Sequence, residues 1–216
     1  PPSMDRLAAR RRLGIPEDGR FIGCVGVIDR RKGCDLLINA FARAKVGPGD
    51  RLLLVGGHEG EIRAMLAGPH GGLVASGRII SIDRFVDPDE LGAALLAMDL
   101  VCTPYPRHVG SASVVIRAAA AGRPVVGSEF GWVRWAIETF RLGQTCNVEN
   151  VDELAAALST GLDAAPEYRL SEAAQRWVRF HTPENFALTW TARVREKLRM
   201  PPAPALHTWE WVERAL

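Results

Sequence analysis

The chain reads FIGCVGV at residues 21–27 and RLLLVG at residues 51–56, two short runs of apolar residues. Neither run alternates strictly between polar and apolar side chains, which is typical of strands buried on both faces of a parallel sheet. Between them, residues 35–44 place apolar side chains at the spacing of one face of a helix. This part of the sequence therefore predicts a strand–helix–strand unit.

Four more apolar runs of the same kind follow, at 78–82, 100–104, 124–127 and 144–148. Amphipathic stretches of helical length separate them. Alternation of this kind is typical of a parallel sheet that is covered by helices on both faces. We predict an α/β fold with a six-stranded parallel sheet.

Three helix starts are marked by capping residues. Asp87-Pro88-Asp89-Glu90 has the pattern of a capping box, with Asp87 as N-cap and Pro88 at the first helical position. Asn150 precedes an apolar-periodic stretch in the same way, and Thr182-Pro183 opens another. We predict one α/β domain over residues 1–164 and a helical tail over 165–216 that packs on it. Residues 200–204 have the composition of a linker.

The composition points to a water-soluble globular protein. The 216 residues carry a formal net charge of only +2, which gives no reason to expect a nucleic-acid partner. No apolar run approaches the length needed to span a bilayer, and we expect no signal peptide. The run Arg10-Arg11-Arg12 is expected to be the solvated face of a short helix, with a patch for phosphate or a membrane surface as the alternative.

Four cysteines are scattered without CxxC spacing, and Cys24 and Cys102 lie inside predicted strands. Buried free thiols are the expected result, and neither a zinc site nor a disulfide framework is indicated. This cysteine usage suits a reducing compartment, so we expect a cytoplasmic protein, with peripheral association with a membrane left open.

Two segments that follow predicted strands carry residues suited to phosphate. In a parallel sheet, ligands bind beyond the carboxyl ends of the strands, where helix N-termini present free N–H groups. The turn 26–33 places Arg30, Arg31 and Lys32 at such a position, where they can neutralise a diphosphate or simply remain solvated.

The second segment is Gly110-Ser111-Ala112-Ser113, just before a predicted helix. Its small residues allow a phosphate to approach the backbone, and Ser111 and Ser113 add hydroxyl donors. An ordinary serine N-cap is the alternative explanation. The sequence has neither a GxGxxG nor a GxxxxGK[ST] motif.

The order of these motifs resembles the C-terminal, nucleotide-sugar-binding domain of retaining glycosyltransferases of the GT-B kind, the group 1 glycosyltransferases. The resemblance covers about residues 13–190. Its elements are the turn 26–33 with its Lys-Gly pair, the LLVGG of 53–57, the segment 85–100, and AAAAGRPVV at 118–126. It implies a Rossmann-like sheet and, as partners, a nucleoside-diphosphate sugar, a glycan, lipid or small-molecule acceptor, and an N-terminal acceptor domain that this chain lacks.

The resemblance also implies residue roles. Lys32, with Arg31 beside it, holds the donor diphosphate close to Gly26 and Val27, and the backbone near Arg84 and Phe85 borders the base. The phosphates meet the amides of a cradle, which is formed by Gly110, Ser111, Ala112 and Ser113. Catalysis of this kind is electrostatic, so no metal and no further cofactor are expected. The DxD pattern at Asp87–Asp89 is better explained by the capping box.

Three positions depart from the pattern of that family. Val27 stands where it usually has an arginine, and Val109 and Arg117 stand where it has two glutamates eight positions apart. The second glutamate normally accepts hydrogen bonds from the ribose, which an arginine cannot do. We include Arg117 among the candidate catalytic residues because it can pair with the diphosphate instead. The hypothesis is a donor-binding glycosyltransferase domain, and the alternative is a degenerate, non-catalytic module of the same fold.

Overall fold

Six parallel strands form one sheet in the order β3-β2-β1-β4-β5-β6. The structure is a computed structural model, and it describes residues 4–201 and 207–216. The strands are β1 (Phe21–Val25), β2 (Arg51–Val55), β3 (Ile79–Ile82), β4 (Leu100–Thr103), β5 (Val125–Ser128) and β6 (Gly143–Cys146). The predicted six-stranded parallel sheet is confirmed. Because the order reverses at β1, the loops after β1 and β4 lie side by side.

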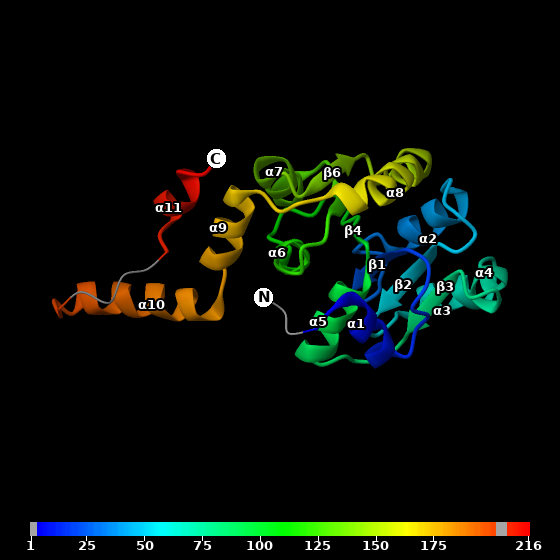
Figure 1. The fold of residues 1–216 in the computed structure, drawn as a ribbon, viewed down its shortest axis with the longest axis horizontal. Helices are drawn as coiled ribbons and strands as arrows, with labels where there is room; N and C mark the ends of the chain where they lie inside the picture. Colours follow the sequence, from blue (N-terminus) through cyan, green and yellow to red (C-terminus); the bar gives the residue numbers. More distant parts are fainter. Residues whose placement is uncertain (1–3, 202–206) are drawn as a thin grey trace.

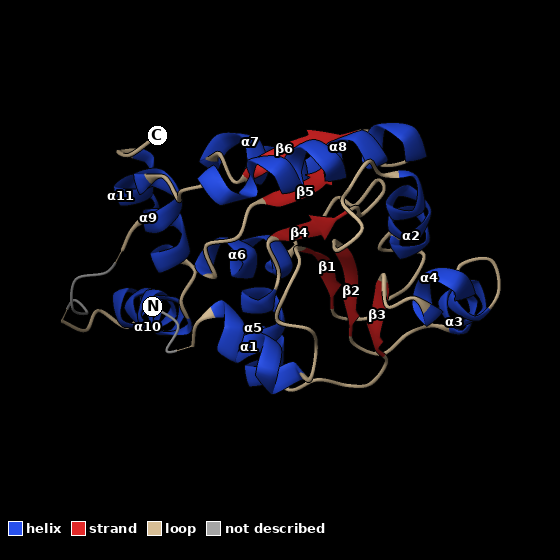
Figure 2. Cartoon of the chain, turned by 45° about the vertical axis from the view of Figure 1, so that its right-hand side comes forward, coloured by secondary structure: helices blue, strands red, loops and turns tan. Residues whose placement is uncertain are grey.

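Helices cover both faces of the sheet (Figures 1 and 2). One face packs against α1 (Arg6–Leu13), α5 (Pro88–Ala97), α6 (Ser113–Ala120) and α7 (Gly131–Phe140). The other face packs against α2 (Cys34–Arg43), α3 (Gly60–Ala67) and α8 (Val151–Ala164), and the short α4 (Gly71–Ala75) follows α3. This arrangement is why the strands are apolar on both sides.

The first strand is shorter than predicted, because Gly26 leaves the sheet with φ of 98°. Gly56 follows β2 with φ of 130°, and a Cβ atom on it would lie 2.0 Å from the carbonyl oxygen of Gly26. Only glycine fits so close an approach of two backbones. Gly26 and Gly56, which lie at the ends of the first two predicted strands, therefore belong to the loops at the carboxyl edge.

The three predicted helix starts are confirmed. Asp87 accepts a hydrogen bond from the Glu90 N–H at 2.7 Å, and Asn150 and Thr182 cap their helices with their side chains. The thiols of Cys24 and Cys102 are buried, and the four cysteines are free, as predicted.

The expectation that Arg10 is solvated is wrong, because its side chain is 1% exposed. The guanidinium donates to Asp99 Oδ2 at 2.8 Å, to the Ala97 carbonyl at 3.0 Å and to the carbonyls of Glu17 and Gly19. It also lies 4.4 Å from the centre of the Phe21 ring. Arg11 and Arg12 are exposed, as predicted. Arg10 thus links α1 to the C-terminal end of α5.

The tail consists of a 3₁₀ turn (Ala165–Glu167) and the helices α9 (Glu172–Phe180), α10 (Pro183–Lys197) and α11 (Trp209–Glu213). Trp177 of α9 is buried and stacks on Phe140 of α7, with ring centres 4.7 Å apart. In contrast, α10 extends away from the sheet (Figure 1), and Phe186 and Trp190 are 70% and 65% exposed.

The predicted domain boundary at residue 164 stays a prediction, and residues 202–204 of the predicted linker 200–204 lie outside the described residues. No helix in the described parts of the chain is long and apolar enough to cross a membrane.

Replacing Arg10 by methionine should lower the free energy of unfolding by about 3–5 kcal/mol, because Asp99 then loses its buried partner. Arg11→Met is the matched control. Its ion pair with Glu17 is solvent-exposed, so this substitution should cost about 0–1 kcal/mol. Urea unfolding of both variants measures the difference. Equal losses would contradict the assigned role of Arg10.

Candidate donor-binding site

The turn after β1 is built around the carboxylate of Asp29, which is 3% exposed. Its Oδ1 accepts the backbone N–H of Lys32 at 2.8 Å, and its carbonyl accepts the N–H of Cys34 at 3.1 Å. Gly33 then starts α2 in the left-handed conformation, with φ of 73°. An aspartate three residues before Lys32 is the sequence signal for this turn, although Asp29 was not among the predicted site residues.

The three cations of the turn have different partners. Arg30 pairs with Asp35 at 3.1 Å and with Glu61 at 3.3 Å, and the pKa of its guanidinium is raised by the hydrogen bond to Glu61. Arg31 is 70% exposed and contacts Asp29 at 3.3 Å.

Lys32 is positioned differently from the two arginines. A Cβ atom on Gly26 would lie 2.9 Å from Lys32 Nζ, so the ammonium rests against the backbone of that glycine. Within the part of the chain that the structure describes, Lys32 forms no ion pair. Of the three cations, Lys32 is therefore the one whose charge is left for a ligand.

The loop after β4 closes on this turn. The N–H of Tyr105 donates to the carbonyl of Lys32 at 3.0 Å, and Lys32 Nζ lies 5.9 Å from the centre of the Tyr105 ring. Gly33 is so close to Pro104 and Pro106 that a Cβ atom would lie 3.0 Å from Pro104 Cβ and 2.9 Å from Pro106 Cδ. The structure therefore joins the β1 turn to the start of the loop that leads to α6.

The predicted cradle lies at the N-terminus of α6. Gly110, Ser111 and Ser113 are exposed, and Ala112 is buried. The N-cap is Ala112, which has no side-chain hydroxyl to cap the helix. An ordinary serine N-cap is therefore not the explanation for this segment. The Val115 N–H donates to the Ala112 carbonyl at 3.0 Å, whereas the N–H groups of Ser113 and Val114 have no acceptor within the helix and are therefore available to an anion.

Arg84 and Phe85 follow β3 at the same edge of the sheet. The Arg84 guanidinium donates to Glu90 at 2.6 and 2.8 Å, and this hydrogen bonding lowers the pKa of the Glu90 carboxyl to about 2. Phe85 is 86% exposed. The Arg84 side chain is thus already paired, whereas the Phe85 ring has no cover among the described residues.

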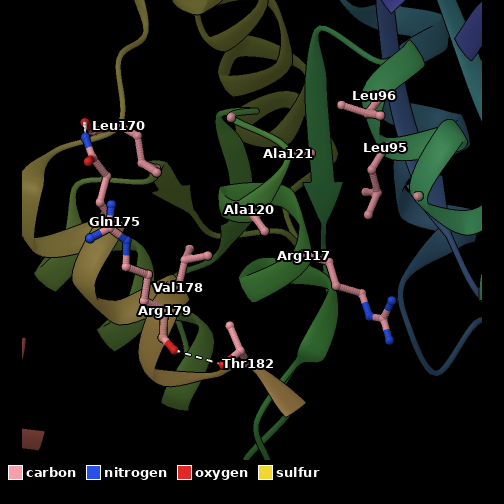
Figure 3. A pocket seen from close by; sticks show the side chains of 12 residues that line it. Leu95, Leu96, Arg117, Ala120, Ala121, Leu170, Gln175, Val178, Arg179 and Thr182 are labelled. Atoms are coloured by element: carbon pink, nitrogen blue, oxygen red, sulfur yellow. Dashed lines mark hydrogen bonds between the residues drawn. The ribbon is translucent and has the colours of Figure 1, made fainter. Parts of the chain in front are cut away.

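Arg117 lies on the last turn of α6 and lines a groove of about 840 Å³ between α5, α6 and α9. Its neighbours there include Leu96, Ala120 and Val178, and none of the groove residues belongs to the turn after β1. Figure 3 shows its guanidinium pointing away from Gln175 and Arg179. The structure therefore brings Lys32 and the loop after β4 together, whereas Arg117 has no contact with the turn after β1.

Two valines line the carboxyl edge where the resemblance expects charged residues. Val27 is 50% exposed and Val109 is 77% exposed. Val109 is also close to the start of α7, since a Cβ atom on Gly131 would lie 3.6 Å from Val109 Cα. Among the described residues, no cluster of three or more His, Cys, Asp or Glu could hold a metal ion.

Comparison with known proteins identifies the family. A family model described as "Glycosyl transferases group 1" matches residues 19–164. The chain belongs to this family. The matched segment contains the Lys32 turn and residues 110–113.

Curated relatives are similar over most of the chain. D-inositol 3-phosphate glycosyltransferases are 33% identical to it, over 171 residues for the protein of Stackebrandtia nassauensis and over 191 residues for that of Mycobacterium tuberculosis. These matches cover 75% and 84% of this chain but only 38% of each relative. The chain thus spans less than half the length of the curated relatives it matches.

Solved structures share the fold. Sucrose-phosphate synthase of Thermosynechococcus elongatus superposes with a TM-score of 0.72 at 25% identity, covering 88% of this chain and 48% of that one. HepE of Anabaena, solved in complex with UDP, gives a TM-score of 0.67 at 21% identity, with 88% and 51% covered. The predicted GT-B C-terminal fold is therefore confirmed.

Replacing Gly33 by alanine should loosen the contact between the two loops. The new Cβ would clash with Pro104 and Pro106. This clash adds to the cost of about 1–2 kcal/mol for a non-glycine residue in the left-handed conformation. Gly77→Ala is the matched control, because Gly77 has φ of 72° and no atom within 4 Å of its added Cβ. Thermal unfolding should show a larger loss for Gly33→Ala, and equal losses would mean that the contact with the prolines does not matter.

Proposed function

We propose that this chain binds a nucleoside-diphosphate sugar at the carboxyl edge of β1 and β4 and acts as the donor half of a glycosyltransferase. The observation that supports this most directly is the unpaired ammonium of Lys32, which rests on Gly26 beside the loop that leads to α6. A diphosphate between Lys32 and the first turn of α6 would meet a cation on one side and free N–H groups on the other.

The same groups suit the chemistry of sugar transfer. Negative charge accumulates on the diphosphate as its bond to the sugar breaks, and fixed donors aimed at this charge stabilise the transition state. Lys32, with Arg31 nearby, supplies positive charge, and the 110–113 backbone supplies N–H groups. The binding site for the acceptor, whether glycan, lipid or small molecule, would lie in a second domain, because the curated relatives are more than twice as long as this chain.

A second candidate is a module of this fold that binds without turnover. The exposed Val27 and Val109, together with Arg117 in a groove away from the β1 turn, favour it. The two candidates differ in the ligand, because the first requires a nucleoside diphosphate beside Lys32 and the second requires only a partner or a sugar.

Lys32→Ala should weaken the binding of a nucleoside diphosphate by about 1–3 kcal/mol, the value of a hydrogen bond to a charged group. Titration calorimetry with UDP, GDP, dTDP and ADP, in the presence of a chelator, measures this loss. Lys45→Ala is the matched control, because Lys45 is exposed just before β2, at the opposite edge of the sheet. Binding that needs a divalent metal, or that Lys32→Ala leaves unchanged, would contradict the assignment.

Arg117→Glu restores a carboxylate that can accept hydrogen bonds from ribose. If the chain is a donor-binding domain, this variant should raise the affinity for the nucleoside diphosphate relative to pyrophosphate, whereas Arg117→Ala should not. The measurement is the ratio of the two affinities in wild type and both variants. No binding of either ligand by any of the three proteins would favour the non-catalytic module.

A further inference from the structure

His58 lies in the loop between β2 and α3, next to the turn after β1, and its side chain is 1% exposed. The two ring nitrogens contact different strands, with Nδ1 2.6 Å from the carbonyl oxygen of Gly56 and Nε2 2.8 Å from Ser81 Oγ. Since a carbonyl oxygen can only accept, Nδ1 carries the proton, and Nε2 accepts the hydroxyl of Ser81. The imidazole therefore links the end of β2 to β3.

The backbone around His58 is joined to the β1 turn. Ile28 and His58 form a parallel bridge, in which the Ile28 N–H donates to the Gly57 carbonyl at 2.9 Å and the Glu59 N–H donates to the Ile28 carbonyl at 3.0 Å. The His58 N–H donates to Asp83 Oδ1 at 2.8 Å. Ile28 immediately precedes Asp29, the residue around which the Lys32 turn is built.

Gly56, the residue that the ring of His58 holds, supports Gly26 directly. The Gly26 N–H donates to the Val55 carbonyl at 2.9 Å, and the Gly56 backbone lies against the Gly26 carbonyl. Lys32 Nζ also lies against Gly26, since a Cβ atom on that glycine would be 2.9 Å from it. A continuous series of contacts therefore runs from Ser81 through His58, Gly56 and Gly26 to the Lys32 ammonium.

We propose that His58 is a positioning residue of the donor site, which holds the turn 26–33 in the geometry that places Lys32 beside the loop after β4. Its effect on the turn does not depend on the identity of the ligand, and only its effect on donor affinity rests on the proposed function. His58 itself contacts neither Lys32 nor Tyr105 and acts through the backbone of Gly26 and Ile28.

The charged groups facing His58 are few. Asp83 Oδ1 lies 3.6 Å from Nδ1, and Asp83 is itself paired with Arg63 of α3 at 2.6 Å. Burial lowers the pKa of His58, and this outweighs the attraction of Asp83. In an opened loop His58 would return to water, where the pKa of a histidine is about 6.5. Because the buried ring has a lower pKa, protonation stabilises the opened loop relative to the closed one as the pH falls below that value.

The first test is hydrogen exchange of the amides of Gly26, Ile28 and Cys34, which donate to the carbonyls of Val55, Gly57 and Asp29 respectively. His58→Leu removes both ring contacts, so these amides should exchange about tenfold faster. His58→Asn keeps a donor for the Gly56 carbonyl and should retain most of the protection. His70→Leu is the matched control: His70 is half-buried, bonds to Asn39 at 3.0 Å, and should leave the turn unchanged.

The second test uses pH and does not require a disruptive variant. Exchange in wild type is compared with that in His58→Asn at about pH 7.5 and about pH 5.5, so that the intrinsic exchange rates cancel. Wild type should lose protection relative to His58→Asn at the lower pH, because only wild type can take up a proton at this position. Unchanged ratios at both pH values, or a folded His58→Leu with wild-type exchange in the turn, would overturn the proposal.

The ligand measurement separates this proposal from the function. UDP, GDP, dTDP and ADP serve as probes at neutral pH, and His58→Leu should raise the dissociation constant of whichever binds wild type by about tenfold. If none of them binds wild type, the proposed function fails while the exchange result stands. If one of them binds, and the turn amides of His58→Leu exchange faster without a loss of affinity for that nucleotide, the turn does not position the contact with the nucleotide. In that case the proposal fails while the function stands.

Discussion

The site depends on the close contact between the loops that follow β1 and β4. The strand order places these two strands next to each other. Gly33 is enclosed by Pro104 and Pro106, and the Lys32 carbonyl is bonded to the Tyr105 N–H. The contact is made by Gly33 in a left-handed conformation and by the backbone carbonyl of Lys32. It therefore fixes the position of Lys32 while the ammonium of this residue stays free.

The charges of the turn are divided between structure and ligand binding. Arg30 is committed to Asp35 and Glu61, and Asp29 uses its carboxylate to shape the turn. Lys32 retains its charge for an anion, and the N-terminus of α6 retains its N–H groups. Under the proposed function, these groups would be preorganised for the diphosphate, which electrostatic catalysis of sugar transfer requires.

The strands, the helix caps and the position of Lys32 and residues 110–113 at the carboxyl edge could be predicted, because they depend on local residue patterns and on the geometry of parallel sheets. The burial of Arg10 could not be predicted, because its partner Asp99 lies 89 residues away in the sequence. The same limit applies to Gly56, since no local pattern indicates that its backbone touches Gly26. Arg117 lines a groove between α5, α6 and α9, and the sequence does not specify how these three helices pack. Its catalytic role therefore stays a prediction.

The most direct test of this account is a crystal structure of the chain with a bound nucleoside diphosphate. The account predicts the diphosphate between Lys32 Nζ and the backbone N–H groups of residues 111–113, with the base on the side of Phe85. A diphosphate bound instead in the groove beside Arg117, or held by the paired Arg30 with Lys32 turned away, would contradict it.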